Sequence, residues 1–438
     1  MTEIKKPPLN LPLQGRLKYK LAFLFKEVSA APLIVFRIAF GVMMFLSLIR
    51  FAANGWIDSL YVQPKFFFTY YGFEWIKPLN ETGMYIVFGL MMLAALCIAA
   101  GYLYRFSAVI FFLLFTYVEL LDKTNYLNHY YFISIISLLM CVLPATKKVV
   151  PRWAILTLQL QMAIVYFFAG IAKINADWLL NAMPLKVWLP TRTNIPFGFL
   201  FDENIVAYIF SWCGMLFDVS IAFFLFNRRT VWYAYAVVIV FHVLTAILFP
   251  GIGMFPFIMI VCASVFLPTS FHEKLLSKTG IEQRTSHIGQ QFNLQFLIIP
   301  ILILHFTIQI ILPLRSHLYP NNLFYTEQGY RFSWRVMLME KAGLVFYHVK
   351  DKNGKLHEIN NHDFLTAQQE KQMSTQPDMI LQFAQFLKEQ FNTNEVYAEA
   401  YVTVNGKGSN LFLDPKINLA TLQDDFSHKK WILAQAVR

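Results

Sequence analysis

Charged residues are scarce in this chain. They make up 14% of its 438 residues, whereas 57% are hydrophobic; a typical soluble protein is about a quarter charged. So little polar surface cannot cover such a core in water, which excludes an ordinary soluble enzyme as well as a disordered or fibrous chain. The net charge is +11, but most basic residues lie between apolar runs. We therefore predict an integral membrane protein with no nucleic-acid partner.

Cysteine is also scarce, and its positions are uninformative. The four cysteines lie in apolar stretches without the spacing of a zinc site or a disulfide framework. They are Cys97, Cys141, Cys213 and Cys262. We expect buried thiols, and no metal site, because no cluster of ligand residues is apparent. The basic segment at 1–29 leads into an apolar run too long for a signal peptide, so we expect the first helix to be retained.

Apolar runs near 20 residues, the length of a helix that crosses a bilayer, recur nine times. They lie at 30–51, 83–104, 106–121, 126–143, 153–173, 204–226, 231–249, 252–268 and 292–314. Loops on one side hold fifteen Lys and Arg residues and loops on the other hold seven. This bias predicts a cytoplasmic N-terminus, and nine spans then place the C-terminus outside.

The composition becomes that of a soluble domain after about Arg315. A DKNGK turn at 351–355 separates two alternating runs, and an amphipathic stretch covers 378–391. Asn405-Gly406 joins the runs 396–404 and 409–413 as in a hairpin. We predict a polytopic all-α membrane bundle at 30–314, followed by a small α+β domain at 315–438 on the outer face.

Polar residues at membrane depth are the candidate functional residues, because ionisable groups there are costly and usually face a bundle interior or a wet cavity. They are Asp122, Asn128 and His129 at the junction of the third and fourth predicted spans, Lys173 at the end of the fifth, and His242 in the seventh. The predicted topology places all of them near the outer membrane face.

Each of these groups also has an ordinary structural explanation. Lys173 could extend its amine from a helix end to the lipid surface. His129 could be an interfacial hydrogen-bonding residue, and His242 could bond a neighbouring helix in the core, the more common role for such a histidine taken alone. The functional explanation gains weight because the groups converge on one membrane face.

Five segments resemble, in order and at similar spacing, the vitamin K-dependent gamma-glutamyl carboxylase family and its HTTM-domain relatives. They are LLDKTNYLNHYYF at 120–132, VYFFAGIAKINADW at 165–178, GIGMFPFIMI at 251–260, GYRFSW at 329–334 and FLDPKINL at 412–419. The resemblance covers about Ala31 to Trp431. It implies a membrane enzyme that uses reduced vitamin K or a related quinol, O₂ and CO₂. Such an enzyme converts Glu of a protein or peptide to gamma-carboxyglutamate while the quinol becomes its epoxide.

The resemblance also implies roles for individual residues. Lys173 matches the family's proposed base, which deprotonates the hydroquinone, and Asn128 with His129 matches the Asn-His pair that orients this chemistry. Tyr330 and Trp334 match the Tyr and Trp that follow the last span, where the quinone or the glutamate would be contacted. We assign Asp122 and His242 to the same binding function.

Physical chemistry supports a lysine in this role. Burial beside an apolar wall disfavours the ammonium form, so a partly buried lysine can act as a base near neutral pH. The candidate walls are Phe167, Phe168 and Ile171. Asp177 would stabilise the ammonium if it faced the amine of Lys173, so we expect it to point elsewhere. A dry pocket at the membrane edge would protect a carbanion from water, and a lipid-soluble quinone could enter it from the bilayer.

The chain departs from the animal enzymes of this family in three respects. Ala172-Lys173 stands where they have Lys-Lys, the predicted outer domain has no cysteine for their interdomain disulfide, and the sequence stops at Arg438 without their C-terminal extension, which helps to engage propeptides. We therefore expect a prokaryotic relative in a plasma or inner membrane, without processive carboxylation. Two alternatives stay open: a quinol epoxidase that carboxylates no protein, and a non-enzymatic HTTM membrane scaffold or carrier.

Overall fold

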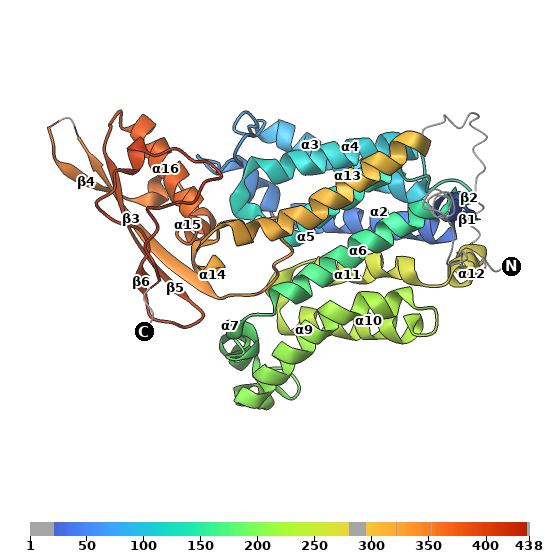
Figure 1. The fold of residues 1–438 in the computed structure, drawn as a ribbon. Coiled ribbons are helices and arrows are strands. Elements are labelled where there is room, and N and C mark those ends of the chain that lie inside the picture. Colours follow the sequence, from blue (N-terminus) through green and yellow to red (C-terminus); the bar gives the residue numbers. More distant parts are fainter. Residues whose placement is uncertain (1–21, 280–294, 321, 352, 436–438) are drawn as a thin grey trace, which may run out of the picture.

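The computed structural model describes residues 22–279, 295–320, 322–351 and 353–435. Most of the predicted N-terminal segment at 1–29 lies outside these residues. A bundle of helices forms one part of the molecule, and a C-terminal domain with a β-sheet packs against one end of it (Figure 1). We call this the domain end of the bundle. A two-stranded sheet of β1 (Glu27–Ser29) and β2 (Val149–Pro151) lies at the opposite end.

Among the described residues, seven helices are long and apolar enough to cross a membrane. They are α2 (Ala31–Ala53), α3 (Glu81–Ala100), α4 (Tyr104–Leu121), α6 (Arg152–Ala172), α9 (Asn204–Phe226), α10 (Val231–Leu248) and α13 (Gln295–Leu314). Large apolar side chains are exposed on these helices, including Leu46, Phe106, Phe223 and Leu304. Exposed apolar surface of this kind suits a helix that faces lipid. The polytopic helical bundle is thus confirmed.

Two of the nine predicted spans take a different form. The fourth is α5 (Asn128–Val142), whose 15 residues reach about 22 Å, less than the ~30 Å of a bilayer core. The eighth is α11 (Phe255–Ala263), followed after a 3₁₀ turn by α12 (Thr269–Thr279) at a bend of 109°. Pro268 lies at this bend, where a proline and the extended residue before it stop a helix. The described residues therefore hold seven spans, or eight if the bent pair is one span, and the count of nine is not confirmed.

The C-terminal domain is built on a four-stranded antiparallel sheet in the order β4-β3-β5-β6. The strands are β3 (Lys341–Lys350), β4 (Leu356–Ile359), β5 (Val396–Val404) and β6 (Asn410–Leu411), and the helices are α14 (Leu323–Thr326), α15 (Ala367–Met373) and α16 (Pro377–Gln390). Alternate residues of β5 are buried in a core that the apolar face of α16 completes. The predicted turn at 351–355, the helix near 378–391 and the hairpin after 396–404 are all confirmed.

The environment of the cysteines differs from the prediction. Cys262 is buried, but Cys97 and Cys141 are half-buried and Cys213 is exposed on α9. A thiol is a small apolar group, so on a membrane helix it can face lipid as well as the protein interior. The prediction of buried thiols was therefore wrong for three of the four.

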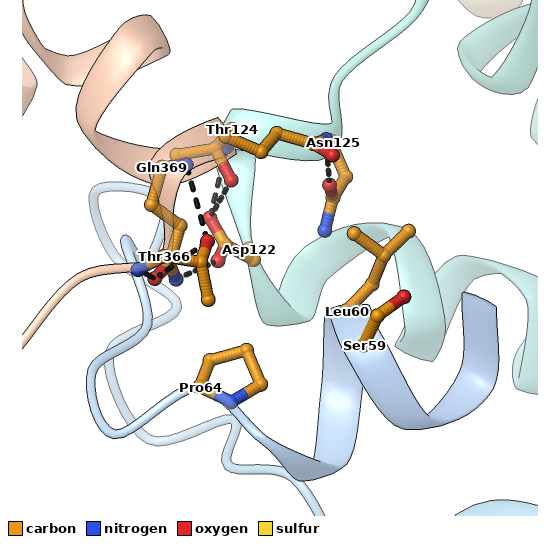
Figure 2. Close-up of a pocket in the computed structure, with 9 residues that line it drawn as sticks. Ser59, Leu60, Pro64, Asp122, Thr124, Asn125, Thr366 and Gln369 are labelled. Carbon is orange, nitrogen blue, oxygen red and sulfur yellow. Dashed lines mark hydrogen bonds between the residues drawn. The ribbon is translucent and has the colours of Figure 1, made fainter. Parts of the chain in front are cut away.

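Several polar contacts join the bundle to the C-terminal domain, and two sets of them centre on buried side chains that follow α4. The buried Asp122 accepts hydrogen bonds from the backbone and hydroxyl of Thr124 and, at 2.8 Å, from Nε2 of Gln369 at the start of α15 (Figure 2). Burial raises the pKa of the Asp122 carboxyl to about 6, although these hydrogen bonds oppose the shift. The space between these side chains is too small for a bound molecule, so Asp122 serves as a domain contact here.

A charged cluster forms the second set of contacts. Asp378 of α16 lies 2.9 Å from Nζ of Lys123 and 2.8 Å from a guanidinium nitrogen of Arg331. Lys123 is 3% exposed and follows α4, whereas Arg331 belongs to the segment that leads from α13 into the sheet. One carboxylate thus holds a cation of the bundle and a cation of the C-terminal domain together. We call these three residues the Asp378 latch.

Candidate functional site

A cavity of about 330 Å³ lies at the domain end of the bundle, between α6, α9, α10 and α11. This volume is within the usual range for small-molecule sites. Apolar and aromatic side chains form most of the wall, and the loop at 336–337 contributes to it from the C-terminal domain. The polar groups in the wall are few, and most of them belong to two pairs: Lys173 with Asp218, and His242 with Tyr166.

Lys173 ends α6 and turns its side chain into the bundle. Its Nζ lies 2.6 Å from Oδ2 of Asp218 in α9 and 3.4 Å from the carbonyl oxygen of Ala169. The indole ring of Trp178 is 5.4 Å away. Lys173 is 7% exposed, so its amine does not reach the lipid surface. The geometry therefore favours the functional explanation of this residue over the interfacial one.

Asp218, the partner of this amine, is not among the functional residues predicted from the sequence. Asp218 stands in the middle of an apolar run, where an ionisable residue is itself a signal of function. Asp177, which we expected to point elsewhere, does so: it accepts hydrogen bonds from Asn405 and Lys407 of the C-terminal domain. The amine of Lys173 nevertheless faces a carboxylate, because a residue distant in sequence supplies one.

The apolar walls beside Lys173 also differ from the prediction. Phe167 and Ile171 are exposed, and neither they nor Phe168 lines the cavity. The face of α6 that does so carries residues 165, 166 and 169 and continues to Lys173 just past its end; residue 169 is four positions after 165, three after 166 and four before 173. The other walls come from different elements and include Trp178, Trp188, Phe241 and Phe249.

His242 lies in the same cavity as Lys173. It is 1% exposed, and its Nε2 lies 3.0 Å from the hydroxyl of Tyr166. Its Nδ1 is buried and makes no hydrogen bond with any described residue. His242 thus bonds a neighbouring helix, as the ordinary structural explanation requires, and also lines the cavity, as the functional explanation requires.

Asn128 and His129 lie just outside the cavity wall. The ring of His129 packs against Phe255 at 5.9 Å between centroids, and His242 packs against the same phenyl ring at 5.7 Å. Phe255 lines the cavity and so stands between the two histidines. Asn128 donates from Nδ2 to the carbonyl oxygen of Arg335 at 2.7 Å, next to the loop at 336–337. It therefore holds a segment of the cavity wall in place.

The other predicted binding residues do not line this cavity. Trp334 is buried and stacks on Tyr131, with 5.0 Å between ring centroids. Tyr330 is half-buried and packs against the core of the C-terminal domain, and Asp122 belongs to the domain contact described above. Their contact with a ligand stays a prediction. Among the described residues, no group of three or more His, Cys, Asp or Glu side chains is arranged to hold a metal ion.

Gly170 allows the close approach of helices that brings Lys173 and Asp218 together. A Cβ at this position would lie 2.5 Å from the backbone nitrogen of Val219, the residue after Asp218. We expect Gly170→Ala to move α9 away, to reduce stability by about 1–3 kcal/mol and to lower activity. Thermal unfolding in detergent measures the change in stability, and the assay of quinol epoxide and labelled peptide described below measures the change in activity. Gly89→Ala is the control, because its Cβ would meet no atom within 4 Å; equal behaviour of the two variants would contradict the prediction.

Comparison with known families covers most of the chain. Residues 25–271 match the HTTM domain, and residues 294–437 match the lumenal domain of vitamin K-dependent gamma-carboxylase. No solved structure matches the chain. The apolar helices identify a multi-pass membrane protein, and the second match indicates an extracytoplasmic C-terminal domain. Because both parts match in order, the chain belongs to the HTTM-domain membrane proteins of the vitamin K-dependent gamma-carboxylase family.

Proposed function

We propose that this protein is a membrane enzyme that couples oxygenation of a reduced quinone, forming its epoxide, to carboxylation of glutamate in a peptide. The observation that carries the proposal is the buried Lys173–Asp218 pair in an otherwise mostly apolar cavity. A buried ion pair contributes little net stability, because desolvation of the charges offsets their attraction. Stability therefore does not explain why the chain keeps the Lys173–Asp218 pair, whereas a catalytic role does.

The cavity suits a lipid-soluble hydroquinone as substrate. Its aromatic walls fit a flat ring. Ile209 and Cys213 of α9 and Leu244 of α10 line the cavity and are also exposed on the surface of the bundle. An apolar tail could pass between these two helices into the bilayer. The substrate would then enter sideways from lipid and would not have to cross the water phase.

The two charges of the pair have complementary tasks in this proposal. Asp218 accepts the proton of a quinol hydroxyl, and the ammonium group of Lys173 stabilises the negative oxygen that results. Both effects are larger in a site that excludes water than at a surface. When bound, the reduced quinone would supply the electrons that reduce O₂. It would also supply a base, stronger than Asp218, that takes the gamma proton of glutamate. CO₂ then adds to the carbon, and no metal takes part.

The remaining assignments follow from the family and from the charge of the loops. We propose a cytoplasmic N-terminus, a plasma or inner membrane, and a Glu-containing protein or peptide that approaches from the side of the C-terminal domain. The loop at 336–337 forms the part of the cavity wall on that side. Asn128 holds this loop, and His129 supports Phe255; both are positioning residues in this scheme.

One observation favours a second candidate, a quinol epoxidase without protein carboxylation. Among the described residues that line the cavity, Lys173 is the only cation, and its charge is already balanced by Asp218. A glutamate side chain would therefore find no free cation within the cavity. This candidate keeps the chemistry of the pair but lacks the second product.

A paired assay separates these functions. Wild type and Lys173→Ala receive vitamin K hydroquinone, O₂, labelled bicarbonate and a short Glu peptide, and epoxide and peptide label are measured separately. We expect both products in wild type and a loss of roughly 10²–10³-fold in the variant, the usual effect of removing a group that stabilises a developing negative oxygen.

The control for this assay is Lys186→Ala, because Lys186 bonds Tyr208 and does not line the cavity. Epoxide without label would establish the second candidate. Neither product in folded wild type would contradict both functions and favour a non-enzymatic scaffold.

A further inference from the structure

The imidazole of His242 has one nitrogen engaged and one free. Nε2 lies 3.0 Å from the hydroxyl oxygen of Tyr166, whereas Nδ1 makes no hydrogen bond with any described residue. The ring is 1% exposed and lines the cavity. A buried polar atom of this kind calls for a hydrogen-bond partner, and a ligand in the cavity would supply one.

The direction of the hydrogen bond to Tyr166 decides what Nδ1 can do. His242 is the only hydrogen-bond partner of the Tyr166 hydroxyl among the described residues. If that hydroxyl accepted a hydrogen bond from Nε2–H, its own buried O–H would be left without an acceptor, which is unfavourable. If it donates to Nε2, its proton is satisfied. A neutral imidazole that accepts at Nε2 carries its proton on Nδ1.

We propose that Tyr166 is a positioning residue that fixes His242 in the Nδ1–H tautomer, so that the cavity presents a hydrogen-bond donor to an oxygen of its ligand. The inference rests on the proposed function only for the identity of that ligand, a quinol or quinone. Tyr166 does not touch the ligand oxygen in this scheme. It acts through His242, in the way that an outer partner commonly orients a histidine.

The spacing of the two polar pairs fits a ring with oxygens at opposite ends. Tyr166 and Lys173 lie on the same face of α6, seven residues apart, which corresponds to roughly 10 Å along the helix axis. The amine of Lys173 folds back to within 3.4 Å of the Ala169 carbonyl oxygen. The distance along the helix axis between this amine and Tyr166 is therefore shorter than the spacing of the two residues. One oxygen of the ring would meet Lys173 and Asp218, and the other would meet Nδ1 of His242.

The first test measures binding and needs no turnover. Wild type, Tyr166→Phe, His242→Asn and the double variant are placed in lipid nanodiscs. Menadione binding is followed by quenching of tryptophan fluorescence, since Trp178 and Trp188 line the cavity. The affinity of 2-methylnaphthalene, which has the same rings without oxygens, is obtained by competition. The control is Tyr104→Phe, whose hydroxyl donates to the Met140 carbonyl elsewhere in the bundle.

We expect Tyr166→Phe to weaken menadione binding roughly fivefold, the loss of about one neutral hydrogen bond, and to leave 2-methylnaphthalene unchanged. In the His242→Asn background Tyr166→Phe should have no further effect, because an asparagine amide has no tautomer to fix. Equal weakening of both ligands, additive effects, unchanged menadione affinity, or no menadione binding to wild type would each overturn the inference.

A second measurement reads the tautomer directly. In ¹⁵N spectra of histidine-labelled protein, the signals that disappear in His242→Asn are those of His242. In wild type they should show a protonated Nδ1 and an unprotonated Nε2. In Tyr166→Phe they should show a mixture of the two tautomers. The opposite tautomer in wild type would overturn the inference. If these results hold while wild type produces neither epoxide nor labelled peptide, the proposed function fails and the assignment of Tyr166 stands.

Discussion

Asp218→Asn should abolish most of the quinol epoxidation while the bundle stays folded. The amide cannot accept the substrate proton, and it removes the negative charge that balances Lys173 at 2.6 Å. It keeps an oxygen that can accept a hydrogen bond from a neutral amine, so the pair loses its charges but not its packing. We expect a loss of roughly 10²–10⁴-fold, similar to that of Lys173→Ala. Epoxide formation and thermal unfolding in detergent measure the two effects.

The matched control for this prediction is Asp177→Asn. Asp177 is close to Lys173 in sequence but bonds Asn405 and Lys407 of the C-terminal domain. It should keep nearly full activity. Because Lys173 and Asp218 act as one unit, the double variant should be little worse than either single variant. Additive losses would show that the two residues act independently.

Asp378→Ala should loosen the contact between the C-terminal domain and the bundle. The substitution leaves Lys123, which is 3% exposed, and Arg331 without their common partner. Removing one partner of a buried pair costs about 3–5 kcal/mol, and the 21% exposure of Asp378 suggests the lower part of this range. Protease digestion should cut the segment at 322–340 faster in the variant. Hydrogen exchange should likewise rise on both sides of the junction.

The control for the latch is Glu395→Gln, which breaks a pair with Lys350 within the C-terminal domain. Both side chains of that pair are more than a third exposed, so the expected change is below ~1 kcal/mol. Equal digestion of Asp378→Ala and Glu395→Gln would contradict the assignment of Asp378 as a stabilising interdomain contact.

The pH dependence of the latch follows from the same charges. Burial alone would raise the pKa of Asp378, but Arg331 and Lys123 hold it well below its usual range. A carboxyl whose pKa is lowered by folding stabilises the folded state at pH values above its pKa in the unfolded chain, about 3.9. This stabilisation is lost as the pH falls towards the pKa in the folded protein. The contribution of Asp378 should therefore be constant from pH 5 to 8.

The sequence located the membrane helices but not their continuity. Hydropathy reports composition, so it could not show that the chain bends by 109° between Phe266 and Thr269 or that α5 begins only at Asn128. Lys173 and His242 could be found because ionisable residues are conspicuous in apolar runs. Asp218 satisfied the same criterion and was overlooked, because no recognised segment contained it. The walls beside Lys173 were misassigned because sequence neighbours on a helix point in different directions.

The exposed side chains in the cavity wall affect how affinity for this site should be expressed. Ile209, Cys213 and Leu244 belong both to the cavity and to the surface that faces lipid. For a ligand that enters from the bilayer, the concentration that determines occupancy is the number of ligand molecules per lipid molecule, not per litre of buffer. Diluting a quinone by adding empty lipid vesicles should lower occupancy as effectively as removing quinone. Apparent constants measured at different protein-to-lipid ratios should therefore agree only when they are converted to mole fractions in the bilayer.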